Sequence, residues 1–364
     1  MTGGIEEATY ESFRGHLGRK VDRNNPIHIL LKVNGAIVDQ AEMRGSNYEL
    51  SAGRVILPSD HVEILAFDYA GRQIKSFEWG QIDRPLPPAW SAGRHYKFPS
   101  VFVLGAAKSG TTSLHVYLDQ HPDIFMSKPK EPFFFEAEYA RGATFYYNKY
   151  FGGWRGEKIV GESRHRNLYL PYIPSRLSDY NPEAKLIVVL RNPAERAVSH
   201  WWHWRSRGLE PLSPAAAFQN DLERILEGKT VASPQEIERY VATFGPDAQG
   251  EYRTYLDSGY YSEQLDRYLQ HFRRERLHIV FFEDLVRNPG GAMRDIFRFL
   301  ELDDQPVSGI DLRPRNQSAA GMWDQVDEKI WCWLIEHYKP HNRRLEQLLS
   351  RSFRDWDTAP RPRT

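Results

Sequence analysis

The sequence predicts an α/β fold: a central parallel sheet with helices on both faces, preceded by a small antiparallel β module. Short apolar segments alternate with segments of helical period, a pattern typical of a parallel sheet that helices cover on both sides. These apolar segments are 101–104, 159–160, 186–190 and 279–282. The first eighty or so residues show strand and turn signals without a helical period. Two domains are therefore predicted, 1–97 and 98–364.

The β module is predicted from two strand pairs. Residues 27–33 run into Asn34-Gly35, a dipeptide favoured in tight hairpin turns, and a second apolar run follows. Residues 62–67 and 73–79 flank another turn. The Pro- and Gly-rich stretch 85–93 has the composition of a linker, which places the domain boundary near residue 97.

Helices are predicted in the second domain from apolar periodicity and start signals. The segments are 112–118, 193–204, 262–272 and 330–349. In 262–272 the apolar residues recur at intervals of three and four, which predicts one buried face.

Composition excludes several classes of protein. Forty-eight Lys and Arg balance 48 Asp and Glu, so no overall field draws the chain to nucleic acid, and an anion site must be local. The single cysteine, Cys332, forbids an intrachain disulfide framework. The first residues lack secretory-signal features, and no uncharged apolar run approaches the roughly 18 residues of a membrane span. We therefore expect a soluble, cytoplasmic protein.

A phosphate-binding loop is the strongest local signal. The segment 103–114 is a strand that enters a Gly-containing loop and then a helix, so backbone N–H groups can surround an anion. Gly105 and Gly110 have the Walker A spacing, but Thr111 stands where that motif has lysine, and Lys108 lies inside the loop. This difference argues against an ATP kinase.

A second anion-binding signal follows the strand that ends at Arg191. Asn192 and Pro193 form a helix-start signature with Glu195, and Ser199 lies farther along the same helix. An Arg at the sheet edge and a hydroxyl on the helix can hold a second phosphate.

Together these residues resemble the sulfotransferase family that uses 3′-phosphoadenosine 5′-phosphosulfate (PAPS). The resemblance covers about residues 98–364 and includes further segments at 161–163, 259–269, 282–285 and 340–345. It implies a P-loop NTPase-like sulfotransferase fold, PAPS as the sulfuryl donor, the product nucleotide PAP as a ligand, and no metal. The donor-binding residues it implies are Lys108, Ser109, Gly110, Thr111, Thr112, Ser113, Arg191, Ser199, Tyr260 and Arg315.

The segment 128–135 resembles heparan-type and bacterial glycan or lipid sulfotransferases, in which a Glu of a Lys-Glu-x-x-Phe-Phe sequence acts as base. On that match Glu131 is the base, and Lys108 stabilises the leaving phosphate. A surface carboxylate beside Lys130 is the plain structural alternative for Glu131.

The sequence expected on the acceptor side differs from that of many sulfotransferases. Many carry Thr-Pro after the Gly-Glu pair, whereas Arg164, His165 and Arg166 intervene in this chain and suit an anionic acceptor. His200 and Trp204 are further acceptor-side residues. His200 and His203 are three residues apart, but no cysteine or further histidine clusters with them, so we expect no metal there. The stretch 208–250 resembles an insertion that acts as a lid.

The sequence supports sulfuryl transfer to a hydroxyl or amine of a glycan-like, small or lipid-linked acceptor. Two alternatives stay open: a Mg-dependent nucleotide phosphotransferase with an atypical P-loop, and a non-catalytic nucleotide- or carbohydrate-binding protein. For the β module three roles are open: holding an extended acceptor, packing on the catalytic domain, or forming a homodimer.

Overall fold

The computed structural model describes residues 3–8, 12–17, 27–33, 36–43, 47–51, 62–67, 73–79, 99–231, 234–242, 253–303, 305–315 and 322–358. The chain divides into two compact units. The first comprises residues 1–98 and 138–152, and the second comprises 99–137 and 153–364. The sequence did not indicate that 138–152 groups with the N-terminal segment.

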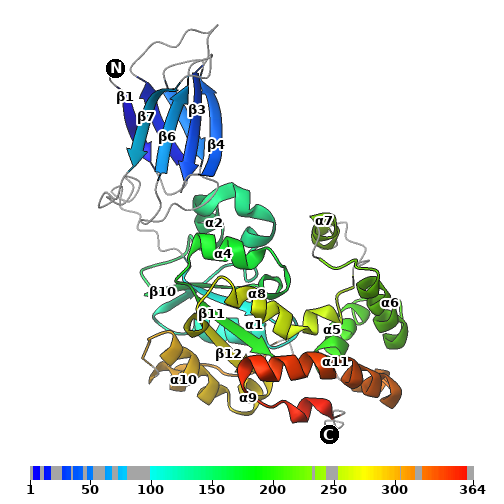
Figure 1. Ribbon diagram of the computed structural model, residues 1–364. Helices are drawn as coiled ribbons and strands as arrows, with labels where there is room; N and C mark the ends of the chain where they lie inside the picture. The colour runs from blue at the N-terminus through cyan, green and yellow to red at the C-terminus, as the bar shows by residue number, and fades with distance from the viewer. Residues whose placement is uncertain are drawn as a thin grey trace. The chain divides into compact units, whose positions relative to one another are not determined.

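Within its described residues, the first unit contains two antiparallel sheets (Figure 1). One has the order β1-β2-β5, formed by Gly3–Ala8, Ser12–Leu17 and Asn47–Ser51. The other has the order β4-β3-β6-β7, formed by Ala36–Met43, Ile27–Val33, Val62–Phe67 and Gln73–Trp79. Both predicted strand pairs form, β3 with β4 and β6 with β7. The first unit also contains the turn η3 (Tyr139–Arg141) and helix α2 (Gly142–Tyr150).

The second unit is built on a five-stranded parallel sheet of order β12-β11-β8-β10-β9, which confirms the predicted fold class. The strands are β8 (Val101–Gly105), β9 (Ile124–Met126), β10 (Ile159–Ser163), β11 (Lys185–Leu190) and β12 (Leu277–Phe281). Because β8 lies between β10 and β11, the loops that follow these three strands leave the same edge of the sheet. That edge is where ligands bind in open α/β sheets.

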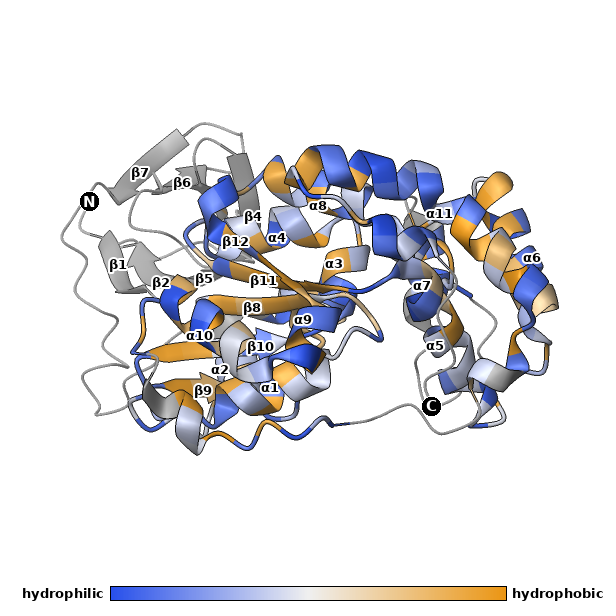
Figure 2. Cartoon of the chain, turned by 90° about the horizontal axis from the view of Figure 1, so that it is seen from below, coloured by the Kyte–Doolittle hydropathy of each residue, from blue (hydrophilic) through white to orange (hydrophobic). Residues whose placement is uncertain are grey.

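Helices cover both faces of this sheet (Figure 2). The described helices of this unit are α1 (Thr111–Asp119), α3 (Arg166–Tyr169), α4 (Ile173–Tyr180), α5 (Pro193–Arg205), α6 (Pro214–Leu226), α7 (Pro234–Ala242), α8 (Tyr261–Leu269), α9 (Phe282–Arg287), α10 (Pro289–Phe299) and α11 (Glu328–Leu349). Short turns are η2 (Phe134–Glu138), η4 (Asp257–Gly259), η5 (Arg274–Arg276), η6 (Gln305–Gly309), η7 (Trp323–Gln325) and η8 (Arg354–Asp357). Among the described helices, none is both long and apolar enough to cross a membrane.

Alternate side chains of β8 pack against the helices on opposite faces of the sheet. Val101 and Val103 are buried in one apolar cluster with residues of α1 and α10, such as Leu114 and Ile296. Phe102 lies on the opposite face, with its ring centroid 6.2 Å from that of Tyr180 in α4. A strand buried on both faces reads as a continuous apolar run, which is the pattern that predicted it.

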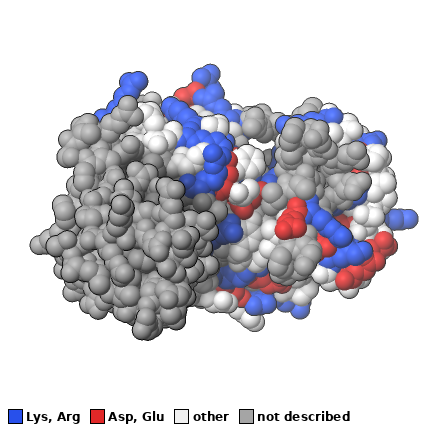
Figure 3. All heavy atoms as spheres, turned by 90° about the horizontal axis from the view of Figure 1, so that it is seen from above, with Lys and Arg blue, Asp and Glu red and all other residues white. Residues whose placement is uncertain are grey.

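Helix α5 begins where the sequence predicts. The side chain of Asn192 accepts hydrogen bonds from the backbone N–H of Ala194 at 3.0 Å and of Glu195 at 3.3 Å, and Pro193 occupies the first turn. This cap fixes the direction in which α5 leaves the sheet edge. The face of the molecule in Figure 3 shows Lys and Arg intermingled with Asp and Glu over its described part, in keeping with the balanced composition.

Replacing Asn192 by Ala is expected to lower the free energy of unfolding by about 1 kcal/mol, because two N–H groups of α5 lose their acceptor. Urea unfolding followed by circular dichroism measures this change. Asn220→Ala, on the exposed face of α6, is the matched control and is expected to cause no loss. Equal stability of the two variants would contradict the capping role.

Candidate active site

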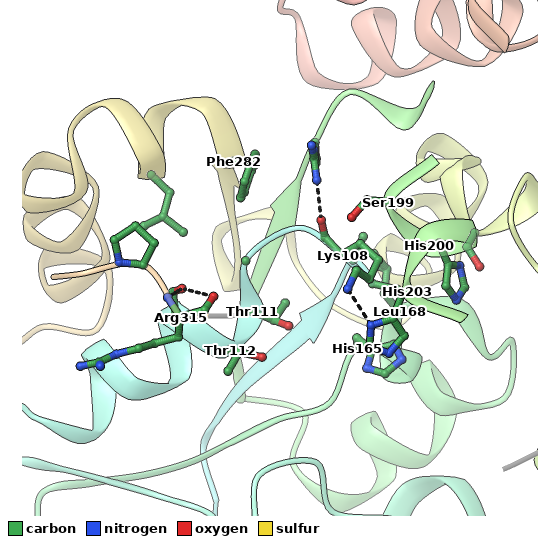
Figure 4. A pocket seen from close by; sticks show the side chains of 18 of the residues that line it. Lys108, Thr111, Thr112, His165, Leu168, Ser199, His200, His203, Phe282 and Arg315 are labelled. Atoms are coloured by element: carbon green, nitrogen blue, oxygen red, sulfur yellow. Dashed lines mark hydrogen bonds between the residues drawn. The ribbon is translucent and has the colours of Figure 1, made fainter. Parts of the chain in front are cut away.

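A cavity of about 700 Å³ opens at the carboxyl edge of the parallel sheet. Its walls come from the loop between β8 and α1, from α3, α5 and α9, and from the segment around Arg315. Figure 4 shows Lys108, His165 and His203 in one part of this cavity and Arg315 in another. The predicted residues Gly110, Thr111, Thr112, Ser113, Glu131, Arg191, Ser199, His200 and Trp204 also line it.

The loop after β8 forms an anion cradle. Gly110 has φ of +84°, stands at the N-cap of α1 and supplies no side-chain cap, so the first N–H groups of this helix remain available to a ligand. A Cβ atom at Gly110 would lie 3.2 Å from the ring of Phe282. Both the backbone conformation and the space therefore favour glycine at this position.

Lys108 points from this loop into the cavity. Its Nζ lies 3.1 Å from Nδ1 of His203, and a guanidinium N–H of Arg191 donates to its carbonyl oxygen at 3.2 Å. Burial, together with the nearby charges of Arg207 and Arg191, lowers the pKa of Lys108 to about 8. A bound anion would raise the pKa again, because it favours the ammonium form.

Arg191 and Ser199 both line the cavity. The guanidinium of Arg191 is almost fully buried, lies over the ring of Phe282 at 4.6 Å, and pairs with Glu195 at 2.8 Å. The sequence had assigned Glu195 only to the helix start. In the structure it also holds the arginine beside the cavity.

Glu131 carries the negative charge of the cavity. Its backbone has φ of +70°, and its carboxylate pairs with Lys130, with Nδ1 of His165 at 3.0 Å and with Arg164 at 3.6 Å. Burial raises the pKa of Glu131, but His165 and Lys130 lower it more, so the net pKa lies well below its usual range. Glu131 is therefore no solvated surface carboxylate.

Arg164 does not reach the cavity, which corrects its prediction as an acceptor-side residue. Its side chain is 3% exposed, and its Nε donates to the fully buried carboxylate of Glu136 at 2.8 Å. A guanidinium N–H also donates to the carbonyl oxygen of Glu131 at 3.3 Å. Arg166 pairs with Glu136 as well, yet it lines the cavity as predicted. The buried charge of Glu136 draws both arginines inward.

Two predicted donor-binding residues also lie away from the cavity wall. The Tyr260 hydroxyl is 2.9 Å from Nε2 of His337, and the Tyr260 ring stacks on His341 at 3.8 Å, so this side chain faces α11. Ser109 is fully buried below the loop, and its hydroxyl has no partner among the described residues. The structure does not bring Tyr260 to the site.

Arg315 lines the cavity, and its backbone N–H donates to the Ser113 hydroxyl at 2.9 Å. Residues 316–321, which follow Arg315, lie outside the described residues. The contact with Ser113 holds this part of the chain against the first turn of α1.

The insertion after α5 contributes a wall that the sequence did not specify. Tyr240 of α7 lines the cavity beside Tyr169, with ring centroids 5.4 Å apart. The Tyr169 hydroxyl donates to Asp257 at 2.7 Å, and Arg224 of α6 joins Asp257 at 2.7 Å to Asp221 at 2.8 Å. A movement of this segment as a lid stays a prediction.

Sequence reasoning also missed cavity residues that only the fold brings together. They are Tyr169, His203, Arg207, Tyr240, Ser258, Gln264, Phe282 and Trp323. The spacing of His200, His203 and Arg207 along α5 and its end was an available signal, because residues three and four apart share a helix face. Nothing in the local sequence marked Tyr240 or Trp323.

The described residues fit a ligand with two anionic groups. The loop N–H groups and Lys108 suit one, and Arg191 with Ser199 suits the other. In the same cavity, the apolar side chains of Phe282, Leu285 and Leu312 offer a surface for a flat ring. The expectation that no metal takes part stays a prediction.

The lowered pKa predicts that the Lys108 amine becomes half unprotonated near pH 8. Amine labelling across a pH series, read by mass spectrometry, measures this midpoint, with the exposed Lys158 as the standard for reagent concentration. Arg207→Leu is expected to move the midpoint to higher pH because it removes a neighbouring positive charge. An unchanged midpoint in that variant would refute the electrostatic account.

Comparison with known proteins assigns the family. A profile described as the sulfotransferase domain matches residues 98–312. The chain is 25% identical to the membrane-associated sulfotransferase kil1 of Dictyostelium discoideum, with 72% of this chain and 67% of that protein covered. It is 28% identical to the mouse heparan sulfate glucosamine 3-O-sulfotransferase 6, with 75% and 77% covered.

Two further similarities concern the same part of the chain. The bovine bifunctional heparan sulfate N-deacetylase/N-sulfotransferase 2 is 26% identical over 70% of this chain, which spans only 30% of that relative. The crystal structure of a sulfotransferase from Alicyclobacillus acidocaldarius is 29% identical, with a TM-score of 0.56, and covers 72% of this chain and 100% of its own. The family profile spans more than half of the chain and includes all five strands of the parallel sheet, so this chain belongs to the sulfotransferase family.

Proposed function

We propose that the protein transfers the sulfuryl group of PAPS to a hydroxyl or amine of a glycan-like acceptor. The observation that carries the proposal is that Lys108, Glu131 and the two predicted anion-binding groups line one cavity. Sulfuryl transfer resembles phosphoryl transfer, so it needs positioned reactants and stabilised charge more than covalent catalysis by the protein, by analogy.

The donor occupies the loop side of the cavity in this proposal. The N–H groups and hydroxyls from Gly110 to Ser113 hold the 5′-phosphosulfate, and Arg191 with Ser199 holds the 3′-phosphate. Lys108 lies where negative charge grows on the bridging oxygen as its bond to sulfur breaks. A positioned cation at such a point stabilises the transition state more than the ground state.

The acceptor occupies the side lined by Glu131 and the aromatic residues. Glu131 takes part in the acid–base catalysis that removes the proton of the acceptor. Arg166, Arg207, Trp204 and Tyr240 line this side and suit a sugar ring that carries negative charge. The names of the heparan sulfate relatives support a glycan as the acceptor class.

Donor binding is tested by calorimetry with adenosine 3′,5′-bisphosphate in the absence of metal. Arg191→Ala is expected to weaken binding about ten- to hundredfold, since charged hydrogen bonds contribute about 1.5–3 kcal/mol each. Arg273→Ala, at a residue whose side chain is 73% exposed, is the control that keeps its affinity. Binding of ATP with Mg²⁺ alone would favour a phosphotransferase instead.

Turnover is tested by transfer from ³⁵S-labelled PAPS to N-desulfated heparan sulfate, which offers amines and hydroxyls. Lys108→Ala is expected to lower kcat by about 10²–10³-fold through lost charge stabilisation. Glu131→Gln is expected to lower kcat by about 10²–10⁴-fold through lost acid–base catalysis. Full activity of either variant would refute the role given to that residue.

A further inference from the structure

Glu131 and His165 form a carboxylate–imidazole pair at the acceptor side. Oε2 of Glu131 lies 3.0 Å from Nδ1 of His165, and both residues line the cavity with Lys108. Glu131 lies in the segment after β9, whereas His165 lies two residues after the end of β10 and immediately before α3. The pairing of these two strands therefore brings the two side chains together.

The Glu131 carboxylate is poorly suited to receive a proton itself. Three positively charged or proton-donating groups surround it: Lys130, Arg164 at 3.6 Å and His165 at 3.0 Å. These contacts stabilise the ionised form, which is why the pKa of Glu131 lies far below its usual range. A carboxylate held in this way accepts hydrogen bonds but is a weak base.

The same contact fixes the tautomer of His165. An ionised carboxylate can only accept, so Nδ1 of His165 must carry the hydrogen and donate it. Nε2 then carries the lone pair, and it has no hydrogen-bond partner among the described residues. The His165 side chain is 29% exposed and lines the cavity, so a ligand in the cavity can reach the imidazole.

The surroundings keep His165 neutral. Burial lowers its pKa, Glu131 raises it, and the charges of Arg166 and Arg164 lower it again, with a net pKa below the ordinary value. His200 and His203 of α5 also face it, and burial lowers the pKa of both. At neutral pH His165 is therefore unprotonated at Nε2.

We propose that Nε2 of His165 is the atom that receives the acceptor proton, and that Glu131 is a positioning residue that orients this imidazole. The inference rests on the proposed function and moves the proton-accepting atom from Glu131 to His165. As the acceptor oxygen or nitrogen bonds to sulfur, its hydrogen passes to Nε2. The bond from sulfur to the 5′-phosphate oxygen breaks, and its electron pair stays on that oxygen beside Lys108.

The first test measures the tautomer and needs no acceptor. Long-range ¹H–¹⁵N spectra of histidine-labelled protein at pH 7.5 are expected to show His165 as the neutral form with hydrogen on Nδ1. His165→Gln assigns the signal by removing it. A hydrogen on Nε2, or a charged ring, would overturn the proposal.

The second test measures turnover with PAPS and N-desulfated heparan sulfate. His165→Ala is expected to lower kcat about 10²–10⁴-fold and to regain at least about tenfold activity when imidazole replaces the missing ring. Its affinity for adenosine 3′,5′-bisphosphate is expected to stay within about threefold, since donor binding uses other residues. The exposed His271→Ala is the matched control, with unchanged kcat and no response to imidazole.

The pH profile separates this role from a structural one. Wild-type kcat is expected to fall on the acid side with a midpoint below 6.5, because protonation of Nε2 removes the lone pair. In His165→Ala the fall of kcat at low pH is expected to disappear. When imidazole is added, the fall is expected to return with its midpoint at the pKa of imidazole. Retention of full activity by His165→Ala, or a loss that imidazole does not rescue, would leave Glu131 as the base. Absence of bisphosphate binding in the wild type would instead refute the proposed function.

Discussion

The close approach of Gly105 to the backbone of residue 165 is the constraint on which the site depends. A Cβ atom at Gly105 would lie 2.9 Å from the carbonyl oxygen of His165 and 2.9 Å from Cβ of Leu168. Its φ of +152° is a further reason for glycine. Because no side chain intervenes, the end of β8 packs directly against the start of α3. The anion cradle and the Glu131–His165 pair consequently share one cavity.

A buried charge cluster supports the part of that cavity that holds Glu131. The carboxylate of Glu136 is fully buried and pairs with Arg164 and Arg166. Such a cluster costs desolvation energy, and the loss of one member leaves an uncompensated charge in the interior. Arg164 in turn contacts Glu131, so the buried cluster holds the Glu131 backbone and carboxylate in place at the cavity. Charge in the interior thus serves the geometry of the site.

Much of the second unit could be predicted from the sequence because its signals are local. The apolar run of β8, the glycines of the loop and the cap at Asn192 each depend on neighbours within a few residues. The partners of Arg164 and Tyr260 could not be predicted in this way, since Glu136 lies 28 residues from Arg164 and His337 lies 77 residues from Tyr260. Strands β1, β2 and β5 were not predicted, because glycine and charged residues interrupt the alternation of apolar and polar residues that marks a strand.

Lys108 and Glu131 share an unusual backbone feature. Both have positive φ, +65° and +70°, in a region that residues with a side chain seldom occupy and that costs about 1–2 kcal/mol. This backbone cost lowers the small net stability of the fold, and it sets the directions in which the two side chains leave the backbone. Selection for higher folding stability would therefore favour glycine at these two positions, whereas selection for the proposed transfer would keep the side chains. Substitution by glycine there would relieve the backbone and remove two charged side chains from the cavity at the same time.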